Sequence, residues 1–388
     1  MAGVAHQIRT LGRRFAEARR GRPGRDPVAV SPGELRDGFA GLLARAPAGC
    51  VRAHALIDLP AGELPWRDTG LVLRRGDEVS VFAAGRVYLS KLLDIWAGPQ
   101  FQLWLRVGSA GPIFNGTRDH HSFVASSDGP LAIAGQLPGQ WGDQTGRVAT
   151  PLAEYARVSG AFAVCIVVWS GSAAEGLQKL EAVGDVAGVL AAERARCAAP
   201  APPPAGWSYL WFLGASEIFT ATESEGRPAI GCRTRANVGI LQREVQLDLT
   251  PGTRLRWRWR VEALPSEIAE DAQFTHDYLS IAVELSNGRD LTYTWSCELS
   301  PETGYWCPLP TWRDREFHVA IRSGRSGLGV WQSEERDLYA DYRHFIGPPP
   351  PRIARVWLIA NSMFQRREGR CCYADIALAQ PSGETRVL

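Results

Sequence analysis

Short runs in which apolar and polar side chains alternate restrict the fold of this chain more than any other feature. The clearest run is LRWRWRV at residues 255–261, in which Arg256, Arg258 and Arg260 alternate with apolar side chains. Because successive side chains of a β-strand point to opposite faces of a sheet, the tryptophans of this run face a core and the arginines face away from it. The arginines form either a solvated face paired with acids of neighbouring strands or a concave face that binds an anionic or sugar ligand.

Similar runs divide the chain into two β regions. TGLVLRRGDEVSVFAAGRVYL and GAFAVCIVVW fall between residues 50 and 170, and YLSIAVELSNGRDLTYTW and RIARVWLIANS fall after residue 207. Asn287-Gly288 between two alternating runs is the strongest hairpin signal. Short strands at this spacing favour antiparallel sandwiches. We therefore predict an all-β fold of two antiparallel, jelly-roll-like β-sandwich domains.

Helical patterns flank the first β region. SPGELRDGFAGLLAR begins with a capping box formed by Ser31 and Glu34, with Pro32 between them, which predicts a helix that docks through an apolar stripe. Apolar residues at helical spacing recur over residues 173–196, and CAAPAPPPAG then predicts a semi-rigid linker. The predicted organisation is a helical N-terminal extension (1–49), a lectin-like sandwich (50–172), a helix with a Pro-rich linker (173–206) and a C-terminal sandwich (207–388).

Composition excludes several classes of function. The chain has 43 Lys+Arg against 41 Asp+Glu in 388 residues, and this balance argues against a nucleic-acid partner. No run approaches the roughly 20 apolar residues of a membrane span, and the first residues lack the apolar core of a secretory signal. The eight cysteines form no CxxC pair and no spacing typical of zinc ligands. We expect a cytoplasmic protein with reduced thiols and no membrane span, with oligomerisation through the helical segments as an open alternative.

The first β region resembles a known lectin family. RRGDEVSVFAAG, LWLRVGSAGPIF and LAIAGQLPGQWGDQTGRV resemble segments of the calcium-dependent galactophilic bacterial lectin family (LecA type). The resemblance implies a lectin-like sandwich whose metal loop would use Gln136, Gln140, Asp143 and Gln144. Ca²⁺ takes six to eight oxygen ligands, and one Asp among three Gln side chains makes a poor cage. We therefore predict no cofactor, with calcium at this loop as the alternative.

The second β region resembles an uncharacterised family. LRWRWRVEALP, FTHDYLSIAVEL and LGVWQSEERDLYADYRHFIGPPP are similar to segments of the domain of unknown function 3047 family. Because that family carries no established activity, the resemblance implies a fold and not a function.

Candidate site residues lie in the second β region. His276 and Asp277 could act as general bases, since a carboxylate beside a histidine tunes its proton affinity, although a strand-start histidine can also simply cap a turn. Tyr339 and Asp341 complete the candidate catalytic set. The predicted ligand-binding side chains are Arg256, Arg258, Arg260, Trp295, Trp331, Arg336 and Tyr342. A structural ion pair that fixes a loop is the alternative interpretation of the segment around Arg336.

Three functions compete on these observations. The first is recognition of a glycan, or of a glycosylated or hydrophobic small molecule, by one or both sandwiches. The second is an enzyme of hydrolase or lyase type with acid–base chemistry in the C-terminal sandwich or at the domain junction. The third is an assembly or scaffold protein. The sequence leaves open whether the chain is catalytic.

Overall fold

The computed structural model describes residues 2–19, 30–63, 66–115, 118–135, 141–149, 151–211, 213 and 216–388, and the chain divides into two units. Sandwich 1 comprises residues 26–201 and 211–215, and sandwich 2 comprises residues 1–25, 202–210 and 216–388. The predicted helical extension over residues 1–49 is thus divided between the two units. No helix within the described ranges is long and apolar enough to cross a membrane.

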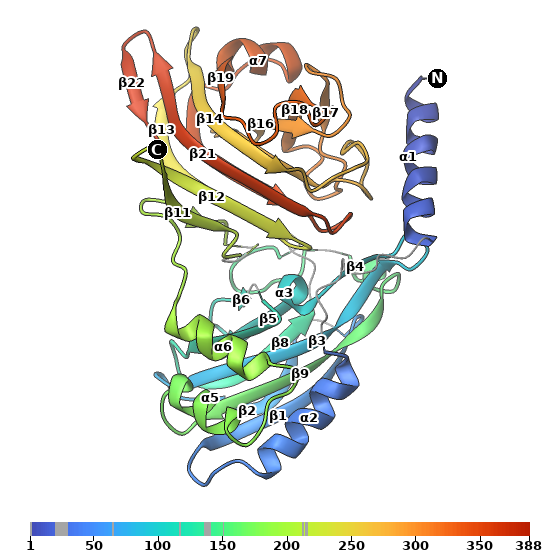
Figure 1. Ribbon diagram of the computed structural model, residues 1–388, viewed down its shortest axis with the longest axis vertical. Helices are drawn as coiled ribbons and strands as arrows, with labels where there is room; N and C mark the ends of the chain where they lie inside the picture. Colours follow the sequence, from blue (N-terminus) through green and yellow to red (C-terminus); the bar gives the residue numbers. More distant parts are fainter. Residues whose placement is uncertain are drawn as a thin grey trace. The chain divides into compact units, whose positions relative to one another are not determined.

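Sandwich 1 consists of two sheets that enclose an apolar core (Figure 1). The larger sheet has the order β1 (Val51–Pro60), β9 (Ser159–Trp169), β3 (Glu78–Ser90) and β4 (Ile95–Ala97), and β7 (His120–Val124) also pairs with β3. The smaller sheet has the order β2 (Arg67–Leu73), β8 (Gly129–Gly135), β5 (Leu103–Val107) and β6 (Phe114–Asn115). Alternate residues of β3 and β5, such as Val81 and Leu105, face the other sheet and are fully buried.

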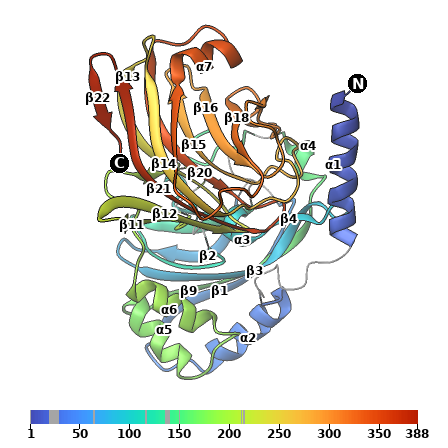
Figure 2. The same cartoon turned by 45° about the horizontal axis from the view of Figure 1, so that its top comes forward.

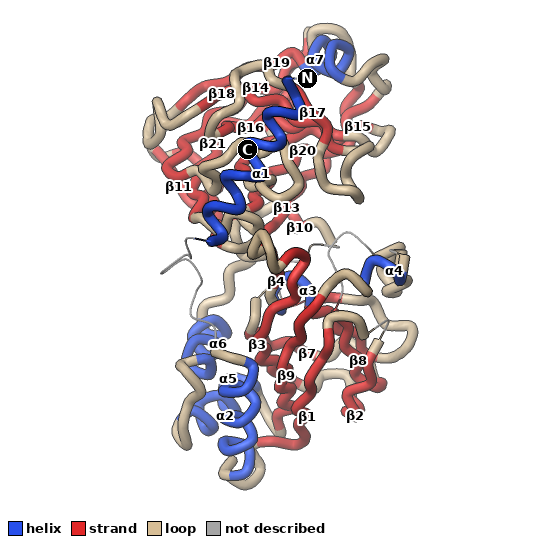
Figure 3. The backbone as a smooth tube through the Cα atoms, turned by 90° about the vertical axis from the view of Figure 1, so that its right-hand side faces the viewer, coloured by secondary structure: helices blue, strands red, loops and turns tan. Residues whose placement is uncertain are grey.

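Helices cover the second face of the larger sheet, as Figure 3 shows. These are α2 (Pro32–Ala44), α5 (Ala173–Glu181) and α6 (Val189–Ala198); α3 (Pro99–Gln102) and α4 (Leu152–Tyr155) are single turns elsewhere in the unit. The predicted capping box of α2 is confirmed, because the Ser31 side chain accepts from the Glu34 backbone N–H and the Glu34 carboxylate accepts from the Ser31 backbone N–H. Strand β9 is buried on both faces, which explains its nearly continuous apolar sequence.

The prediction of one helix over residues 173–196 is wrong, because the segment forms α5 and α6 with a break between them. Gly184 and Gly188 adopt positive φ angles of 154° and 80°, and Ala187 also has a positive φ. Such conformations end a right-handed helix. The apolar stripe continues across the break because both helices pack on the same sheet.

Sandwich 2 also consists of two sheets around an apolar core (Figure 2). The seven-stranded sheet has the order β10 (Ser208–Tyr209), β13 (Val238–Asp248), β20 (Arg352–Asn361), β15 (Tyr278–Leu285), β16 (Asp290–Ser296), β18 (Glu316–Ser323) and β17 (Gly304–Trp306). The six-stranded sheet has the order β11 (Phe219–Ser224), β12 (Arg227–Arg235), β21 (Glu368–Gln380), β14 (Arg254–Ala263) and β19 (Gln332–Asp337), and β22 (Gly383–Arg386) pairs with β21. Only β16 and β18 among the described strand pairs run parallel. The predicted all-β fold with two sandwiches is therefore confirmed.

The LRWRWRV run lies in β14, as predicted. Trp257 and Trp259 are buried in the core with their rings edge to face at 5.8 Å, and the arginines that alternate with them point to the outer face. The predicted hairpin at Asn287-Gly288 is also confirmed, since β15 and β16 pair antiparallel on either side of it. The turn at Pro251-Gly252 carries the chain from the seven-stranded sheet to the six-stranded sheet.

The first helix, α1 (Ala2–Arg19), packs against sandwich 2 (Figure 3). The His6 Nε2 atom lies 2.9 Å from the Asp271 carboxylate, and Arg13 Nη1 lies 2.7 Å from Glu298. Arg14 is fully buried and donates from Nη2 to the Phe364 carbonyl oxygen at 2.8 Å. Polar side chains on one face of α1 therefore attach the beginning of the chain to residues more than 250 positions away.

Candidate functional site

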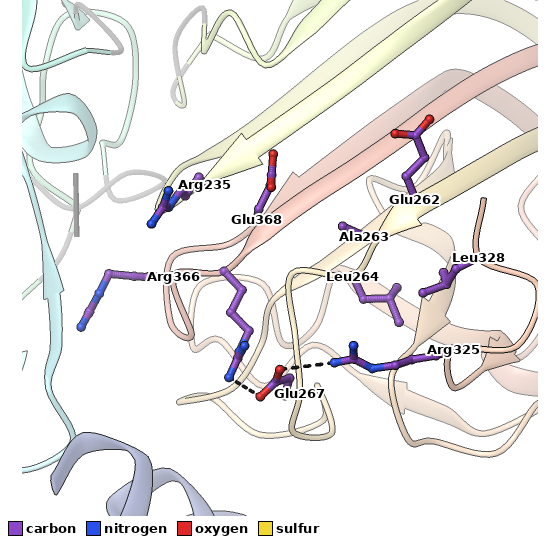
Figure 4. A pocket seen from close by; sticks show the side chains of 10 residues that line it. Arg235, Glu262, Ala263, Leu264, Glu267, Arg325, Leu328, Arg366 and Glu368 are labelled. Atoms are coloured by element: carbon purple, nitrogen blue, oxygen red, sulfur yellow. Dashed lines mark hydrogen bonds and ion pairs between the residues drawn. The ribbon is translucent and has the colours of Figure 1, made fainter. Parts of the chain in front are cut away.

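A charged pocket of about 390 Å³ opens where three strands of the six-stranded sheet begin or end (Figure 4). Arg235 ends β12, Glu368 begins β21, and Glu262 and Ala263 end β14. The remaining lining residues lie on connections between strands: Leu264, Glu267, Arg325, Leu328, Arg366 and Arg367. The pocket therefore combines strand ends, whose backbone is fixed by the sheet, with loop side chains.

Glu267 is the centre of the charge network in this pocket. Its carboxylate pairs with the Arg367 guanidinium and lies 3.3 Å from Arg325 Nη2, as the dashed lines of Figure 4 show. The Glu267 carbonyl oxygen accepts from Arg13 Nη2 of α1 at 2.8 Å, and Arg367 also lies 3.6 Å from the Glu17 carboxylate of α1. These contacts hold one carboxylate between two guanidinium groups on the pocket wall.

The lining determines which ligands the pocket can take. Four guanidinium groups provide only donors and three carboxylates provide only acceptors, while Ala263, Leu264 and Leu328 add an apolar surface. The formal charges nearly cancel, so the lining does not select strongly for anions or cations. A matching ligand must both donate and accept hydrogen bonds at neighbouring atoms.

The predicted acid–base residues are buried away from this pocket. His276 and Asp277 are both fully buried. Burial lowers the pKa of His276 to about 3 and raises the pKa of Asp277 to about 8. The Asp277 carboxylate accepts from the backbone N–H groups of Phe364 (2.9 Å) and Gln365, and so ties two loops together. Neither side chain reaches a surface on which a substrate could bind.

The second predicted set, Arg336, Tyr339, Asp341 and Tyr342, is brought together by β19 and α7 (Leu338–Phe345). Arg336 donates to both oxygens of Asp341 at 2.8 and 3.0 Å, and Asp341 also accepts from the Tyr293 hydroxyl at 2.8 Å. Tyr342 is buried, and its hydroxyl accepts from Asn287 Nδ2 at 2.8 Å, while Tyr339 is half-buried against the core. This geometry corresponds to the alternative interpretation, an ion pair that fixes a segment of the fold.

The arginines of β14 pair with acids on neighbouring strands, on the turn between β11 and β12, and on β14 itself. Arg256 lies 2.6 Å from Glu335, Arg258 lies 3.1 Å from Glu225 and 3.3 Å from Asp375, and Arg260 lies 3.1 Å from Glu262. Arg258 and Arg260 also lie over the half-buried ring of Trp331, at 5.0 and 5.4 Å from its centroid. This matches the first of the two interpretations of the arginines, a solvated face paired with acids.

Trp295 belongs to the core of sandwich 2. Its ring is 1% exposed, and its Nε1 atom donates to the Gly324 carbonyl oxygen at 2.9 Å. The ring packs beside Trp259 with the centroids 5.8 Å apart. It is therefore placed to fill the core and not to contact a ligand.

The loop predicted as an alternative calcium site is only partly described. Gln136 and Gln140 lie outside the described residues. Asp143 accepts from the Thr145 backbone N–H at 3.0 Å and from Arg147 Nε at 3.1 Å, and its hydrogen bonds with Thr145 and Arg147 lower its pKa to about 2. The Gln144 side chain is exposed. The one carboxylate of the loop thus already faces a cationic side chain.

A third group of polar residues was not singled out as a set by the sequence. His276, Cys307, Glu316 and His318 converge in the interior of sandwich 2, with one potential metal-ligating atom of each within 4.8 Å of the others. Glu316 and His318 alternate along the otherwise apolar run EFHVAI, which is a detectable signal because both then face the same side of a strand. Cys307 and His276 come from loops, and their spacing in the sequence does not indicate that they join this group.

Residues 205–377, of which all but 211–215 belong to sandwich 2, match the family model described as "Protein of unknown function (DUF3047)", and the predicted resemblance is thereby confirmed. No curated protein matches the chain.

Solved structures that match this chain include the EclA N-terminal domain, a PllA-like lectin, with 14% identity and a TM-score of 0.24 over 31% of this chain and 99% of that one. TmCBM61 in complex with β-1,4-galactotriose has 11% identity and a TM-score of 0.25 over 46% of this chain and 90% of that one. The xyloglucanase domain of NopAA from Sinorhizobium fredii, in complex with cellobiose, has 7% identity and a TM-score of 0.27 over 46% of this chain and 94% of that one.

Proposed function

We propose that sandwich 2 recognises a hydroxyl-rich ligand, a glycan or a glycosylated small molecule, in the pocket around Glu267. The observation that carries the proposal is the placement of the Glu267 carboxylate between the guanidinium groups of Arg325 and Arg367 on the pocket wall. A sugar hydroxyl donates one hydrogen bond and accepts others, so it can bind to a carboxylate and a neighbouring guanidinium at the same time.

Further features of the pocket support a sugar over other ligands. Adjacent hydroxyls of a sugar ring match the two oxygens of a carboxylate or the two donors of a guanidinium edge. Leu264 and Leu328 offer an apolar surface for the C–H groups of the ring. Because the formal charges of the lining nearly cancel, the pocket offers no strong net attraction for a phosphate-rich ligand.

The proposal is for binding and not for catalysis. The residues predicted as general bases, His276 and Asp277, are fully buried and lie outside the pocket lining. A general base has to lie within hydrogen-bonding reach of the proton that it removes from a substrate.

The test is a glycan array followed by calorimetry with the best ligand. Arg325→Ala and Glu267→Gln each remove a hydrogen bond to a charged group, so the dissociation constant should rise by about 10- to 100-fold. Arg227→Ala is the matched control, because Arg227 is an exposed arginine of β12 that pairs with Asp375 and does not line the pocket. Wild-type affinity in both pocket variants, or no glycan bound at millimolar concentration, would overturn the proposal.

A further inference from the structure

The seven-stranded sheet of sandwich 2 has a second buried face that is polar. One face of the sheet joins the apolar core, and the alternate residues point away from it. These alternate residues are nevertheless buried: Ser280, Asp290, Thr292, Thr294, Ser296, Glu316 and His318 are each at most 3% exposed. Buried polar side chains are costly unless they have partners, so this layer needs an explanation.

The connection between β14 and β15 helps to cover this layer. Its Glu270 carboxylate accepts from Ser296 Oγ at 2.5 Å and from the Cys297 backbone N–H at 2.8 Å, which ties the connection to β16. The same connection carries His276 at its end and Glu267 of the charged pocket near its start.

Four potential ligands converge beneath this cover. Glu316 and His318 are the first and third residues of β18, and Cys307 directly follows β17, whose pairing with β18 brings the thiol beside them. His276 enters from the connection before β15. All four residues are buried, and one ligand atom of each lies within 4.8 Å of the other three.

Hydrogen bonds orient two of these ligands. His276 Nδ1 lies 2.7 Å from the Glu270 carbonyl oxygen, and because a carbonyl only accepts, Nδ1 carries the hydrogen. The lone pair of Nε2 is then directed at Cys307 Sγ, 3.3 Å away. The Tyr278 hydroxyl donates to Glu316 Oε1 at 2.8 Å. Donation from a histidine to a backbone carbonyl and hydrogen bonding of a ligating carboxylate are typical of the residues that surround a bound metal ion.

The distances fit a tetrahedral ion. With Zn–N, Zn–O and Zn–S bonds of about 2.0–2.3 Å, the ligand atoms of a tetrahedron lie about 3.3–3.6 Å apart. Cys307 Sγ lies 3.3 Å from His276 Nε2, and Glu316 Oε1 lies 3.4 Å from His318 Nε2. Two of the six edges of the required tetrahedron are therefore already close to the required length, and all four ligand atoms lie within 4.8 Å of one another.

His318 gives an independent indication of a ligand. Its side chain is fully buried, and neither ring nitrogen makes a hydrogen bond to a described residue, although Nε2 lies 3.4 Å from the Glu316 carboxylate. Its ring is held in place by stacking on Tyr305, with the ring centroids 5.0 Å apart and an interplanar angle of 8°. A buried imidazole that makes no hydrogen bond is destabilising unless something binds one of its ring nitrogens.

We propose that His276, Cys307, Glu316 and His318 together bind one divalent transition-metal ion, with zinc as the best match. A thiolate, a carboxylate and two neutral imidazoles carry two negative charges, which a divalent cation balances in this buried site. Thiolate and imidazole ligands select zinc-like ions over calcium or magnesium. Four protein ligands leave no position for a substrate, so the ion is structural and fixes the connection that carries Glu267.

Metal content of the full-length protein tests the proposal. Protein from zinc-supplemented cultures should contain one zinc per chain by mass spectrometry, and Cys307→Ser and His318→Gln should each lower the content by at least about 10-fold. Cys372→Ser, a buried thiol of the other sheet, and His54→Gln, an exposed histidine, are matched controls that should retain the metal. Tyr278→Phe should weaken zinc binding by about 10- to 100-fold without abolishing it.

If the variants do not fold, metal binding by the wild-type protein alone tests the proposal. After chelation, titration with Co²⁺ should produce tetrahedral d–d bands and a thiolate-to-cobalt charge-transfer band, and Zn²⁺ should restore the melting temperature that chelation lowers. Absence of zinc and of the cobalt spectrum in the wild type would overturn the proposal, because Cys307 would then only donate a thiol hydrogen bond to His276. Equal metal content in the Cys307→Ser, His318→Gln and control variants would overturn it as well.

Discussion

Replacing Arg336 by methionine should destabilise sandwich 2 through the carboxylate that it leaves behind. Arg336 makes four hydrogen bonds of 2.6–3.0 Å, two to Asp341 and two to Glu302. The Glu302 side chain is 58% exposed and can return to water, whereas the Asp341 side chain is 15% exposed and keeps only the Tyr293 hydroxyl among these partners. The loss of stability in Arg336→Met should therefore come almost entirely from the unpaired Asp341 carboxylate.

The size of the effect follows from this difference. Breaking a buried ion pair costs about 3–5 kcal/mol, and the residual exposure of Asp341 places Arg336→Met near about 3 kcal/mol. Glu302→Gln, which removes the exposed partner, should cost about 1 kcal/mol or less. Because Asp341→Asn removes the charge that needs Arg336, a double-mutant cycle should give a coupling energy of about 2 kcal/mol.

Hydrogen exchange measured as a function of urea concentration, followed in peptides from β19 and α7, reports the free energy of unfolding of this region. The reasoning is refuted if Arg336→Met costs no more than Glu302→Gln, or if the coupling energy with Asp341→Asn is zero.

Two further predictions concern sandwich 1. Gly176→Ala should destabilise it by about 1–3 kcal/mol in thermal unfolding, because a Cβ at Gly176 would lie 2.2 Å from the buried Trp169 ring. Gly41→Ala in α2 is the control and should be neutral or stabilising, because a Cβ there would meet nothing within 4 Å. Equal effects of the two substitutions would contradict this prediction. Burial lowers the pKa of His121 from 6.5 to about 4. As the pH falls below 6.5, the unfolded chain therefore binds a proton at this histidine before the folded chain does, and the folded state loses stability between pH 6.5 and pH 4. Between pH 7.5 and pH 5 this loss should be about 2 kcal/mol by urea unfolding, and it should be absent in His121→Gln; an unchanged pH dependence in that variant would count against the assignment.

The local pattern of the sequence predicts much of the fold because strand faces and turns depend on neighbouring residues. The period-two run around Trp257 and Trp259 correctly predicts which side chains enter the core, and Asn287-Gly288 correctly predicts a hairpin. The break at Gly188 is missed because the apolar pattern of α5 and α6 continues across it. The packing of α1 on sandwich 2 is missed because His6 and Asp271 meet only through the tertiary structure.

The candidate site is less predictable because its residues, like His6 and Asp271, meet only through the tertiary structure. Of the pocket and the metal cluster, the sequence singles out only His276, and it assigns that residue to catalysis. The Glu-x-His pattern of Glu316 and His318 marks one strand face, but Cys307 joins them only because β17 pairs with β18. The pocket charges lie on separate connections, and Glu267 and Arg325 come together only when those connections meet at one end of the sandwich.

The most direct test of the account is hydrogen–deuterium exchange of the whole protein with and without the best glycan from the array. The account predicts protection confined to the peptides that contain Glu267, Arg325 and Glu368, with no change at residues 141–149 of sandwich 1. Protection at residues 141–149 without protection at Glu267 would contradict it and would place the glycan site in sandwich 1.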